Sequence, residues 1–419
     1  MCLNKNSREI SLSILTNVLA KNRKLNKEFT FQIQKINKKD ISFVKNLVYG
    51  VLRIKDSIDI SIKKYCHGEY DKFKERRKNI LRIGFYQIDR VNSVPNYASV
   101  STTVELAKTE NFKFSKMTNA ILMNFIRNKD KIITSRKTLN HCGSLLSEWR
   151  KYYSETEILD LCEWNNSIPK VWFRADSKTL DKITIEEDVA INRHPDIDNY
   201  FYFDDSKYGI EKFVKNGLID VQSPSSGLVL SMLDIKKNDT IIDACAAPGG
   251  KSKHIKNIID KTNKLHLNDK NHNKFLLLKR DFDGQVNSIT CKDASIDKFQ
   301  TVDKILLDVP CSSTGTIQKN PDIKWRKIDL KQLNLLQFKI LKNMSKFLNK
   351  NGVIIYSTCS INISENFEII DKFLKVNKNF KLDNAAKFLK AKYVKDKCMF
   401  VFPPKSGLEG MFAARLVKV

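Results

Sequence analysis

Three apolar stretches of the chain each end in side chains that can carry out chemistry. Residues 241–251 read IIDACAAPGGK, residues 306–311 read LLDVPC and residues 354–359 read IIYSTC. Short apolar runs of this kind are typical of strands buried in a parallel sheet. Because the carboxyl ends of parallel strands face one crevice, we expect a glycine loop, an aspartate and two thiols to meet at one site. That combination suits covalent activation of a pyrimidine ring beside a bound cofactor.

The first stretch continues into a loop suited to binding a cofactor. Residues 245–250 are small, and Lys251 and Ser252 begin a predicted helix. Glycines let the backbone approach a ligand closely, and free N–H groups at the start of a helix bind anions. A nucleotide P-loop is the alternative, but it requires a glycine where Cys245 stands, and Pro248 would disturb the phosphate nest.

A regular alternation of strands and helices is expected to position these residues. Apolar strands are predicted at 240–244, 264–267, 303–308 and 353–358, and helices near 251–260, 271–282, 329–349 and 363–375. This alternation predicts a doubly wound, mainly parallel sheet. Residues 411–417 are expected to form its last strand.

The preceding part of the chain is predicted to form two smaller domains. Apolar residues recur at helical spacing along 10–19 and 41–52, and further helices are predicted at 74–92, 96–109 and 115–128. Residues 131–140 are mostly polar and are expected to be a linker. A helix at 154–165, followed by short extended runs, then predicts a small α+β domain. We therefore expect domains at 1–138, 141–235 and 236–419.

The composition favours a polyanionic partner such as RNA. The 419 residues carry a formal net charge of +27 at pH 7. A positively charged protein gains affinity for RNA because its contacts with phosphates release condensed counterions. The alternative explanation of the positive charge is a biased amino-acid composition across the source proteome. No apolar run has the length of a membrane span, and polar side chains interrupt the mildly apolar stretch at 10–20, so neither a membrane anchor nor a signal peptide is expected. The nine cysteines contain no C-x-x-C pair and the six histidines show no metal-ligand spacing, which predicts no metal site and a reducing cytoplasm.

Together, these motifs resemble those of the AdoMet-dependent RNA cytosine-C5 methyltransferases of the RsmB/NOP family, and more closely its RsmB/Sun-type members. Those members carry a helical NusB-like domain, which the stretches at 48–53, 80–87 and 119–125 resemble. The resemblance covers nearly the whole chain. It implies an all-α NusB-like domain that binds RNA, a small α+β middle domain, and a C-terminal α/β Rossmann-like methyltransferase domain with an antiparallel last strand.

The resemblance implies S-adenosyl-L-methionine (AdoMet) as the cofactor. The loop would hold the methionine carboxylate, and its residues are Cys245, Ala246, Ala247, Pro248, Gly249, Gly250 and Lys251. Asp269 matches the acid that accepts the ribose hydroxyls, although it could instead cap the helix after it. Asp293 matches the next acid of the family, near the adenine. Asp308 is expected to face both the cofactor and the target base.

The chemistry of cytosine explains the need for a thiol. Carbon 5 is a poor nucleophile toward a sulfonium methyl group, and adding a thiolate to carbon 6 activates it. The resemblance assigns this attack to Cys359 and the breakdown of the adduct to Cys311, whereas the Pro-Cys nucleophile of DNA cytosine methyltransferases would favour Cys311. An ordinary thiol is only slightly ionised at neutral pH, so Lys251 is a candidate for stabilising the thiolate. Asp308 would hydrogen-bond the cytosine edge.

Three further segments carry expectations that depend on the structure. Ser223 and Gly227 stand where the family usually has Asp and Gln. Residues 320–326 match a family loop near the substrate pocket, although Trp325 could simply be packed. Glu365 stands three residues after Asn362, which is the spacing of a helix N-cap.

The resulting hypothesis is a cytoplasmic enzyme that forms 5-methylcytosine in 16S ribosomal RNA, free or in an immature small-subunit particle. One alternative keeps this chemistry and places it on transfer RNA or large-subunit RNA. The other is a non-catalytic RNA-binding factor in ribosome assembly.

Overall fold

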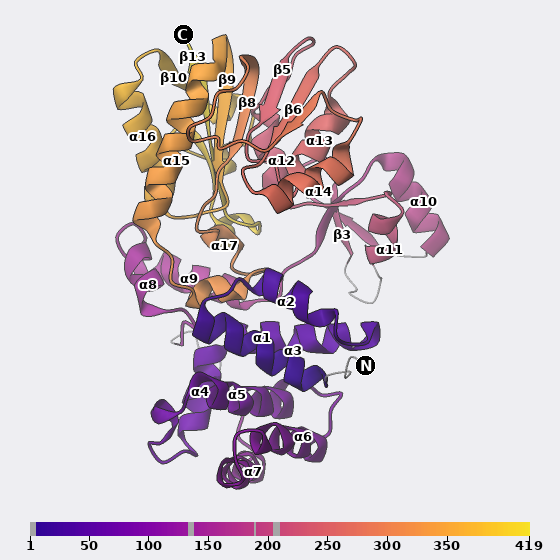
Figure 1. Cartoon of the computed structure of the whole chain (residues 1–419), viewed down its shortest axis with the longest axis vertical. Coiled ribbons are helices and arrows are strands. Elements are labelled where there is room, and N and C mark those ends of the chain that lie inside the picture. Colours follow the sequence, from indigo (N-terminus) through magenta and orange to yellow (C-terminus); the bar gives the residue numbers. More distant parts are fainter. Residues whose placement is uncertain (1–5, 133–137, 188–189, 204–209) are drawn as a thin grey trace. The chain divides into compact units, whose positions relative to one another are not determined.

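The computed structural model describes residues 6–132, 138–187, 190–203 and 210–419 (Figure 1). The chain folds into two compact units, each built from two separate stretches. The helical unit comprises Met1–Ile168 and Ile317–Ile328, and the sheet unit comprises Pro169–Thr316 and Asp329–Val419. The predicted linker at 131–140 cannot be compared in full, because 133–137 lie outside the described residues.

All the helices predicted for the first part of the chain are present in the helical unit. Its α-helices are α1 (Ser7–Lys21), α2 (Leu25–Ile33), α3 (Ile41–Arg53), α4 (Lys55–Lys63), α5 (Glu75–Arg90), α6 (Asn96–Lys108), α7 (Phe112–Arg127), α8 (Gly143–Trp149) and α9 (Glu155–Asn166). Short 3-10 helices lie at Lys38–Asp40 and Tyr70–Lys72. No helix in the described part of the chain has the length and apolar character needed to cross a membrane.

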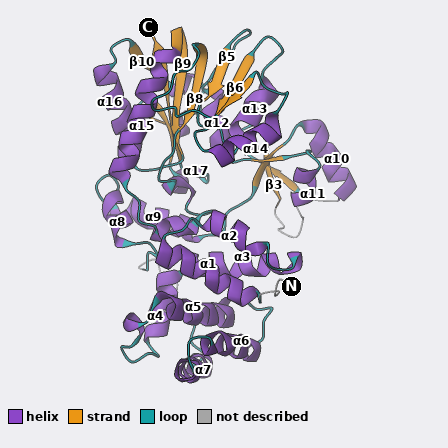
Figure 2. Cartoon of the chain, viewed as in Figure 1, coloured by secondary structure: helices purple, strands orange, loops and turns teal. Residues whose placement is uncertain are grey.

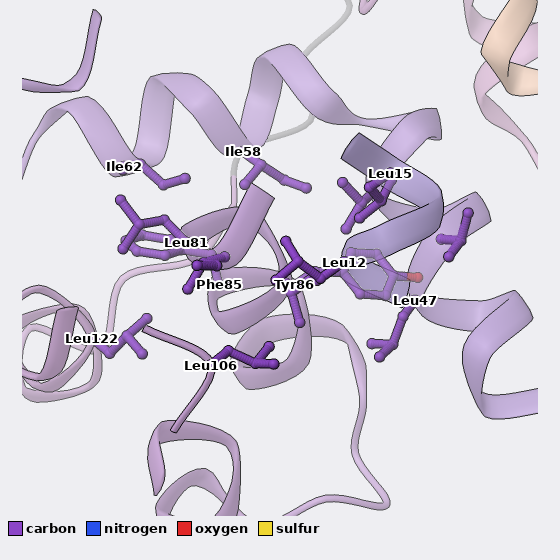
Figure 3. Packing of buried hydrophobic residues seen from close by; sticks show 14 of the residues in the cluster. Leu12, Leu15, Leu47, Ile58, Ile62, Leu81, Phe85, Tyr86, Leu106 and Leu122 are labelled. Atoms are coloured by element: carbon purple, nitrogen blue, oxygen red, sulfur yellow. The ribbon is translucent and has the colours of Figure 1, made fainter. Parts of the chain in front are cut away.

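The apolar faces of α1 and α3–α7 pack into one core (Figure 3). Leu15, Leu47 and Phe85 are fully buried there. Side-chain caps fix where two of these helices begin: Asn6 accepts a hydrogen bond from the Arg8 amide, and Asn111 accepts one from the Phe114 amide. Helical spacing of apolar residues therefore predicted the buried faces of α1 and α3, whereas α4 was not predicted.

A segment far along the sequence completes the helical unit. Residues 317–328 contain the 3-10 helix η4 (Pro321–Trp325). Lys324 is fully buried, and its Nζ donates to the carbonyl of Arg53 at 2.9 Å and to Asn166. Trp325 Nε1 donates to the carbonyl of Leu52 at 2.8 Å. Trp325 is therefore packed against the helical core, which is the structural alternative considered from the sequence.

The main sheet of the sheet unit has nine strands, in the order β11-β12-β13-β9-β8-β5-β6-β7, with β10 paired to β13. The strands are β5 (Thr240–Asp243), β6 (Lys264–Asn268), β7 (Ser288–Thr290), β8 (Val302–Asp308), β9 (Leu348–Thr358), β10 (Phe380–Asp383), β11 (Val394–Lys395), β12 (Cys398–Val401) and β13 (Met411–Lys418). The pairs from β9 through β8, β5 and β6 to β7 are parallel, and β13 is antiparallel to β9. The predicted α/β fold and its antiparallel last strand are confirmed.

Helices flank this sheet (Figure 2). They are α12 (Pro224–Ser231), α13 (Gly250–Ile258), α14 (His272–Phe282), α15 (Leu330–Met344), α16 (Phe367–Val376) and α17 (Pro403–Ser406). Two predicted boundaries were wrong. The helix predicted to run to 349 ends at Met344, because Leu348 already pairs with Val302 in the sheet. The helix predicted from 363 begins as a 3-10 turn at Ile363–Glu365, and α16 follows it.

A smaller antiparallel sheet forms the α+β part, in the order β2-β3-β1-β4. Its elements are β1 (Trp172–Arg174), α10 (Ser177–Glu187), β2 (Ile191–Arg193), β3 (Tyr200–Phe203), α11 (Ile210–Lys215) and β4 (Asp220–Val221). Phe173 and Phe201 lie in its own apolar core.

We predict that Gly50→Ala destabilises the helical unit. A Cβ atom at Gly50 would lie 2.0 Å from Tyr86 Oη, and Tyr86 is buried. Overpacking of this kind lowers the free energy of unfolding by about 1–3 kcal/mol. This loss exceeds the gain of roughly 0.5–1 kcal/mol that alanine provides over glycine within a helix. Urea unfolding followed by circular dichroism measures the change.

Gly143→Ala is the matched control, because a Cβ atom there meets nothing within 4 Å. We expect it to leave the free energy of unfolding unchanged or slightly higher. Equal stability of the two variants would show that Tyr86 moves aside freely.

Candidate active site

The parallel pairing of β8 with β9 brings the two predicted thiols together. Asp308 pairs with Ser357 at the carboxyl ends of these strands. The loops that follow place Cys311 Sγ 3.3 Å from Cys359 Sγ, and both residues are partly exposed. The two thiols can therefore share one proton and contact one substrate.

The surroundings shift the pKa values of the two thiols in opposite directions. The hydrogen bond from Cys311 lowers the pKa of Cys359, and the charge of Lys251 adds to this effect, while burial and Asp308 oppose it. The same hydrogen bond, together with burial, raises the pKa of Cys311 well above its usual range. Cys359 is therefore the thiol that ionises first. A thiolate is the nucleophilic form of cysteine.

Lys251 and Asp308 form an ion pair beside the thiols. Lys251 Nζ lies 2.6 Å from Asp308 Oδ2, and Ser357 Oγ donates to Asp308 Oδ1 at 3.2 Å. Burial opposes the charge of Lys251, but Asp308 outweighs it and raises the pKa of the ammonium group. The Asp308 side chain is 33% exposed, so its carboxylate can still meet a ligand.

A cavity of about 440 Å³ opens beside this ion pair. The sequence predicted several of its lining residues as cofactor-binding ones: Cys245, Ala247, Asp269, Asp293 and Asp308. Leu336 and Ile340 of α15 supply an apolar wall. A cavity with several carboxylates and an apolar wall fits a ligand that combines hydroxyl groups, a cationic group and a flat ring.

The loop at 245–251 has the shape that its glycines allow. Gly249 has φ +105, and a Cβ atom there would lie 2.7 Å from the ring of Phe282. The helix α13 begins at the next residue, Gly250. Asp243, at the end of β5, accepts a hydrogen bond from Ser252 Oγ at 2.6 Å and so attaches the strand to the first turn of this helix.

Asp269 and Asp293 both line the cavity, and different contacts hold their carboxylates in place. Asp269 Oδ2 accepts from the Ala247 amide at 3.3 Å, and the N-cap of α14 is Asn271 rather than Asp269. The capping alternative for Asp269 is therefore wrong. Lys270 Nζ lies 2.5 Å from Asp293 Oδ2 and helps to lower the pKa of that carboxyl against the opposing effect of burial.

Cys245 is a third thiol at the cavity, but its surroundings suppress its reactivity. Burial raises its pKa, and the charges of Asp243, Asp269 and Asp308 raise it further. The eight cysteines within the described residues are free thiols. Among the described residues, no group of three or more His, Cys, Asp or Glu side chains is arranged to hold a metal ion.

A buried contact near the loop was not predicted. Gln222 Nε2 donates to the carbonyl of Gly250 at 3.0 Å, and its Oε1 accepts from Tyr200 Oη at 2.6 Å. The Tyr200 hydroxyl fills the space beside Gly227, where a Cβ atom would lie 2.5 Å from it. The departure at Gly227 thus makes room for the tyrosine. Only the unusual glycine could have suggested this contact from the sequence.

The second departure, Ser223, has no structural explanation here. Its side chain is buried, and its hydroxyl has no hydrogen-bond partner among the described residues.

Glu365 was predicted as part of an N-cap with Asn362, and Asn362 is indeed the N-cap residue of the 3-10 turn Ile363–Glu365, but without a capping bond from its side chain. That side chain instead donates to Glu365 Oε2 at 3.0 Å. Glu365 is fully buried and also accepts from Ser312 and Ser360, which follow the two thiols directly. The spacing located the N-cap position but not the contacts of Glu365, because Ser312 and Gln337 come from distant segments.

Comparisons with known proteins agree with this architecture. Residues 230–417 match the family model described as 16S rRNA methyltransferase RsmB/F, and residues 5–127 match the NusB family model. The probable ribosomal RNA small subunit methyltransferase B of Bacillus subtilis (strain 168) is 27% identical over 399 residues, which cover 89% of each chain. Ribosomal RNA small subunit methyltransferase B of Shewanella oneidensis is 28% identical over 401 residues, covering 91% of each.

Solved structures share the fold. The crystal structure of PH0851 has a TM-score of 0.78 at 21% identity and covers 99% of this chain and 100% of that one. NSun6 from Pyrococcus horikoshii with SFG has a TM-score of 0.58 at 20% identity and covers 66% of this chain and 98% of that one.

We predict that iodoacetamide at pH 7 labels Cys359 faster than Cys311, because only the thiolate reacts and Cys359 ionises first. Replacing Lys251 with Met removes a charge that lowers the pKa of Cys359, so it should slow this labelling several-fold. Mass spectrometry of tryptic peptides measures both rates. The exposed Cys291 serves as the control for reagent access. Preferential labelling of Cys311 would contradict the assignment.

We also predict a pH-dependent stability term from Asp243. Burial raises its pKa from 3.8 to about 7. Between these two pH values Asp243 is ionised in the unfolded chain but still protonated in the folded one. The folded state therefore binds more protons, and it loses stability as the pH rises. Asp243→Asn cannot ionise. The free energy of unfolding of the wild type, relative to this variant, should therefore fall from pH 4 to pH 7 by up to about 1.4 kcal/mol per pH unit. A constant difference would show that Asp243 ionises equally in both states.

Proposed function

The chain belongs to the RsmB/F family of AdoMet-dependent ribosomal RNA methyltransferases, with a NusB-family segment over residues 5–127, and from this we propose that it forms 5-methylcytosine in 16S ribosomal RNA. The observation that carries the proposal is the pair of thiols, with sulfur atoms 3.3 Å apart, beside the Lys251–Asp308 ion pair. One thiol can attack a pyrimidine while the other stays protonated.

In the proposed reaction, the Cys359 thiolate adds to carbon 6 of cytosine, and carbon 5 then accepts the methyl group. Loss of the carbon 5 proton restores the double bond and expels the Cys359 thiolate. Cys311 assists this release, since its sulfur lies 3.3 Å from the one that carries the base. Asp308 hydrogen-bonds the polar edge of the cytosine. Dividing one difficult displacement into such steps lowers the barrier.

AdoMet would bind in the cavity of about 440 Å³ and supplies the methyl group. The residues that would hold it are the loop 245–251, Asp269, Asp293 and Asp308. The loop would bind the methionine carboxylate, and Asp269 would accept the ribose hydroxyls. Asp293 would lie near the adenine.

The positive charge supports an RNA substrate, and the helical residues 1–138 are proposed as the module that binds it. Residues 141–235 would link this module to the methyltransferase domain at 236–419. The target base must leave its stack to reach Cys359. We place the enzyme in the cytoplasm, acting on 16S RNA or on an immature small-subunit particle.

We predict that Cys359→Ala abolishes methyl transfer, by at least a thousandfold, while AdoMet binding is retained. The side chain removed is the nucleophile, whereas the cavity is unchanged. Transfer of a radiolabelled methyl group to RNA and calorimetric binding measure the two properties. Cys311→Ala should instead trap enzyme on RNA as a covalent complex. Ordinary turnover by either variant would remove that residue's proposed role.

The substrate is tested by deleting the gene in its host and sequencing bisulfite-treated RNA. Loss of one 16S cytosine methylation, restored by the wild type and not by Cys359→Ala, is the expected result. Loss in transfer RNA or large-subunit RNA would keep the chemistry and change the substrate. No loss in any RNA would favour an assembly factor without catalysis.

A further inference from the structure

Glu365 is a fully buried carboxylate whose five hydrogen bonds all come from neutral groups. Its Oε1 accepts from the Ser312 amide at 2.8 Å and from Gln337 Nε2 at 3.0 Å. Its Oε2 accepts from the hydroxyls of Ser312 and Ser360 and from the amide of Asn362. We call these five residues the Glu365 network.

An ionised carboxylate is costly to bury unless hydrogen bonds replace its hydration. Both oxygens of Glu365 are hydrogen-bonded, although Gln337 Oε1 has no partner among the described residues, and displacing any donor would leave the buried carboxylate short of a partner. The Glu365 network therefore fixes the backbone and side chains that donate to it.

The donors are the residues next to the two thiols. Ser312 follows Cys311, and Ser360 follows Cys359. Gln337 of α15 also donates to the carbonyl of Pro310 at 3.0 Å, directly before Cys311. One carboxylate thus joins the loop after β8 to the loop after β9, through contacts on both sides of Cys311.

We propose that Glu365 is a positioning residue that holds the two thiols at the separation required for methyl transfer and release. The inference rests on the proposed function for the roles of Cys311 and Cys359, and it adds a residue that touches neither the base nor the cofactor. The charge of Glu365 also contributes to raising the pKa of Cys311, after the larger effects of Cys359 and of burial. Losing the network should therefore impair both the attack and the release.

The separation of the thiols can be measured without RNA. Diamide oxidises neighbouring thiols to a disulfide at a rate that depends on their proximity, and mass spectrometry quantifies the Cys311–Cys359 product in the full chain. We expect Glu365→Ala to slow this reaction at least tenfold. Glu365→Gln, which keeps one oxygen and can rearrange its hydroxyl partners, should lie between Ala and the wild type.

Glu28→Gln is the matched control, because Glu28 is a buried, hydrogen-bonded carboxylate of the helical unit. It should keep the wild-type rate. Gln337→Leu provides a second test if Glu365→Ala does not fold, since it removes the donor to both Glu365 and Pro310. Wild-type disulfide rates in the folded Glu365 and Gln337 variants would overturn the proposal.

Activity then separates this inference from the proposed function. Single-turnover methyl transfer by Glu365→Ala should fall at least tenfold, with KM for AdoMet within twofold of the wild type and partial recovery in Glu365→Gln. Slow disulfide formation with a normal transfer rate would overturn the positioning role. If the wild type itself transfers no methyl group to RNA, the proposed function fails, and the disulfide rates still decide whether Glu365 positions the thiols.

Discussion

The parallel pairing of β8 with β9 is the constraint on which the site depends. It aligns Asp308 with Ser357, so the loops that leave the two strands start side by side and face the same edge of the sheet. Neither loop carries the chemistry alone. The pKa of Cys359 is lowered by its hydrogen bond with Cys311 from the neighbouring loop, and the charge of Lys251 adds to this effect.

At this edge of the sheet, the pKa of each ionisable group depends on the opposing effects of burial and of specific hydrogen-bond and charge partners. Burial raises the pKa of Asp243 and of Cys245, and the hydrogen bond with Cys359, together with burial, raises the pKa of Cys311. Cys359 lies in the same surroundings, yet its pKa is lowered because hydrogen bonds and a cation outweigh the loss of hydration. The difference in pKa between two adjacent thiols thus arises from the hydrogen bonds of Cys359 with Cys311 and Ser313 and from the charge of Lys251.

The parts of the fold that could be predicted are those that depend on local pattern. Apolar runs located β5, β6, β8 and β9, and helical spacing located α1, α3, α5, α6 and α7 but not α2 and α4, because burying one face imposes a period on the sequence. The short strands β7, β10, β11 and β12 were missed, since two to four residues give no period. The two thiols and Asp308 were found because they end predicted parallel strands, whereas Asp293 was proposed only through the family resemblance.

Side-chain contacts between distant segments could not be predicted. Glu365 was interpreted through its neighbour Asn362, although its partners Ser312 and Gln337 come from elsewhere in the chain. The contact of Gln222 with Gly250 depends on a tyrosine from the small sheet. Such contacts leave no period in the sequence, because they are fixed only when the elements have packed together.

The discontinuous helical unit has a consequence for the synthesis of the chain. Residues 169–316 leave the ribosome after the nine helices given above for this unit and before the segment that completes it. Until that segment emerges, the carbonyls of Leu52 and Arg53 lack the donors Trp325 and Lys324. The helical unit therefore reaches its final stability only after β8 has been translated, and folding of the nascent chain cannot be completed strictly from the first domain to the last.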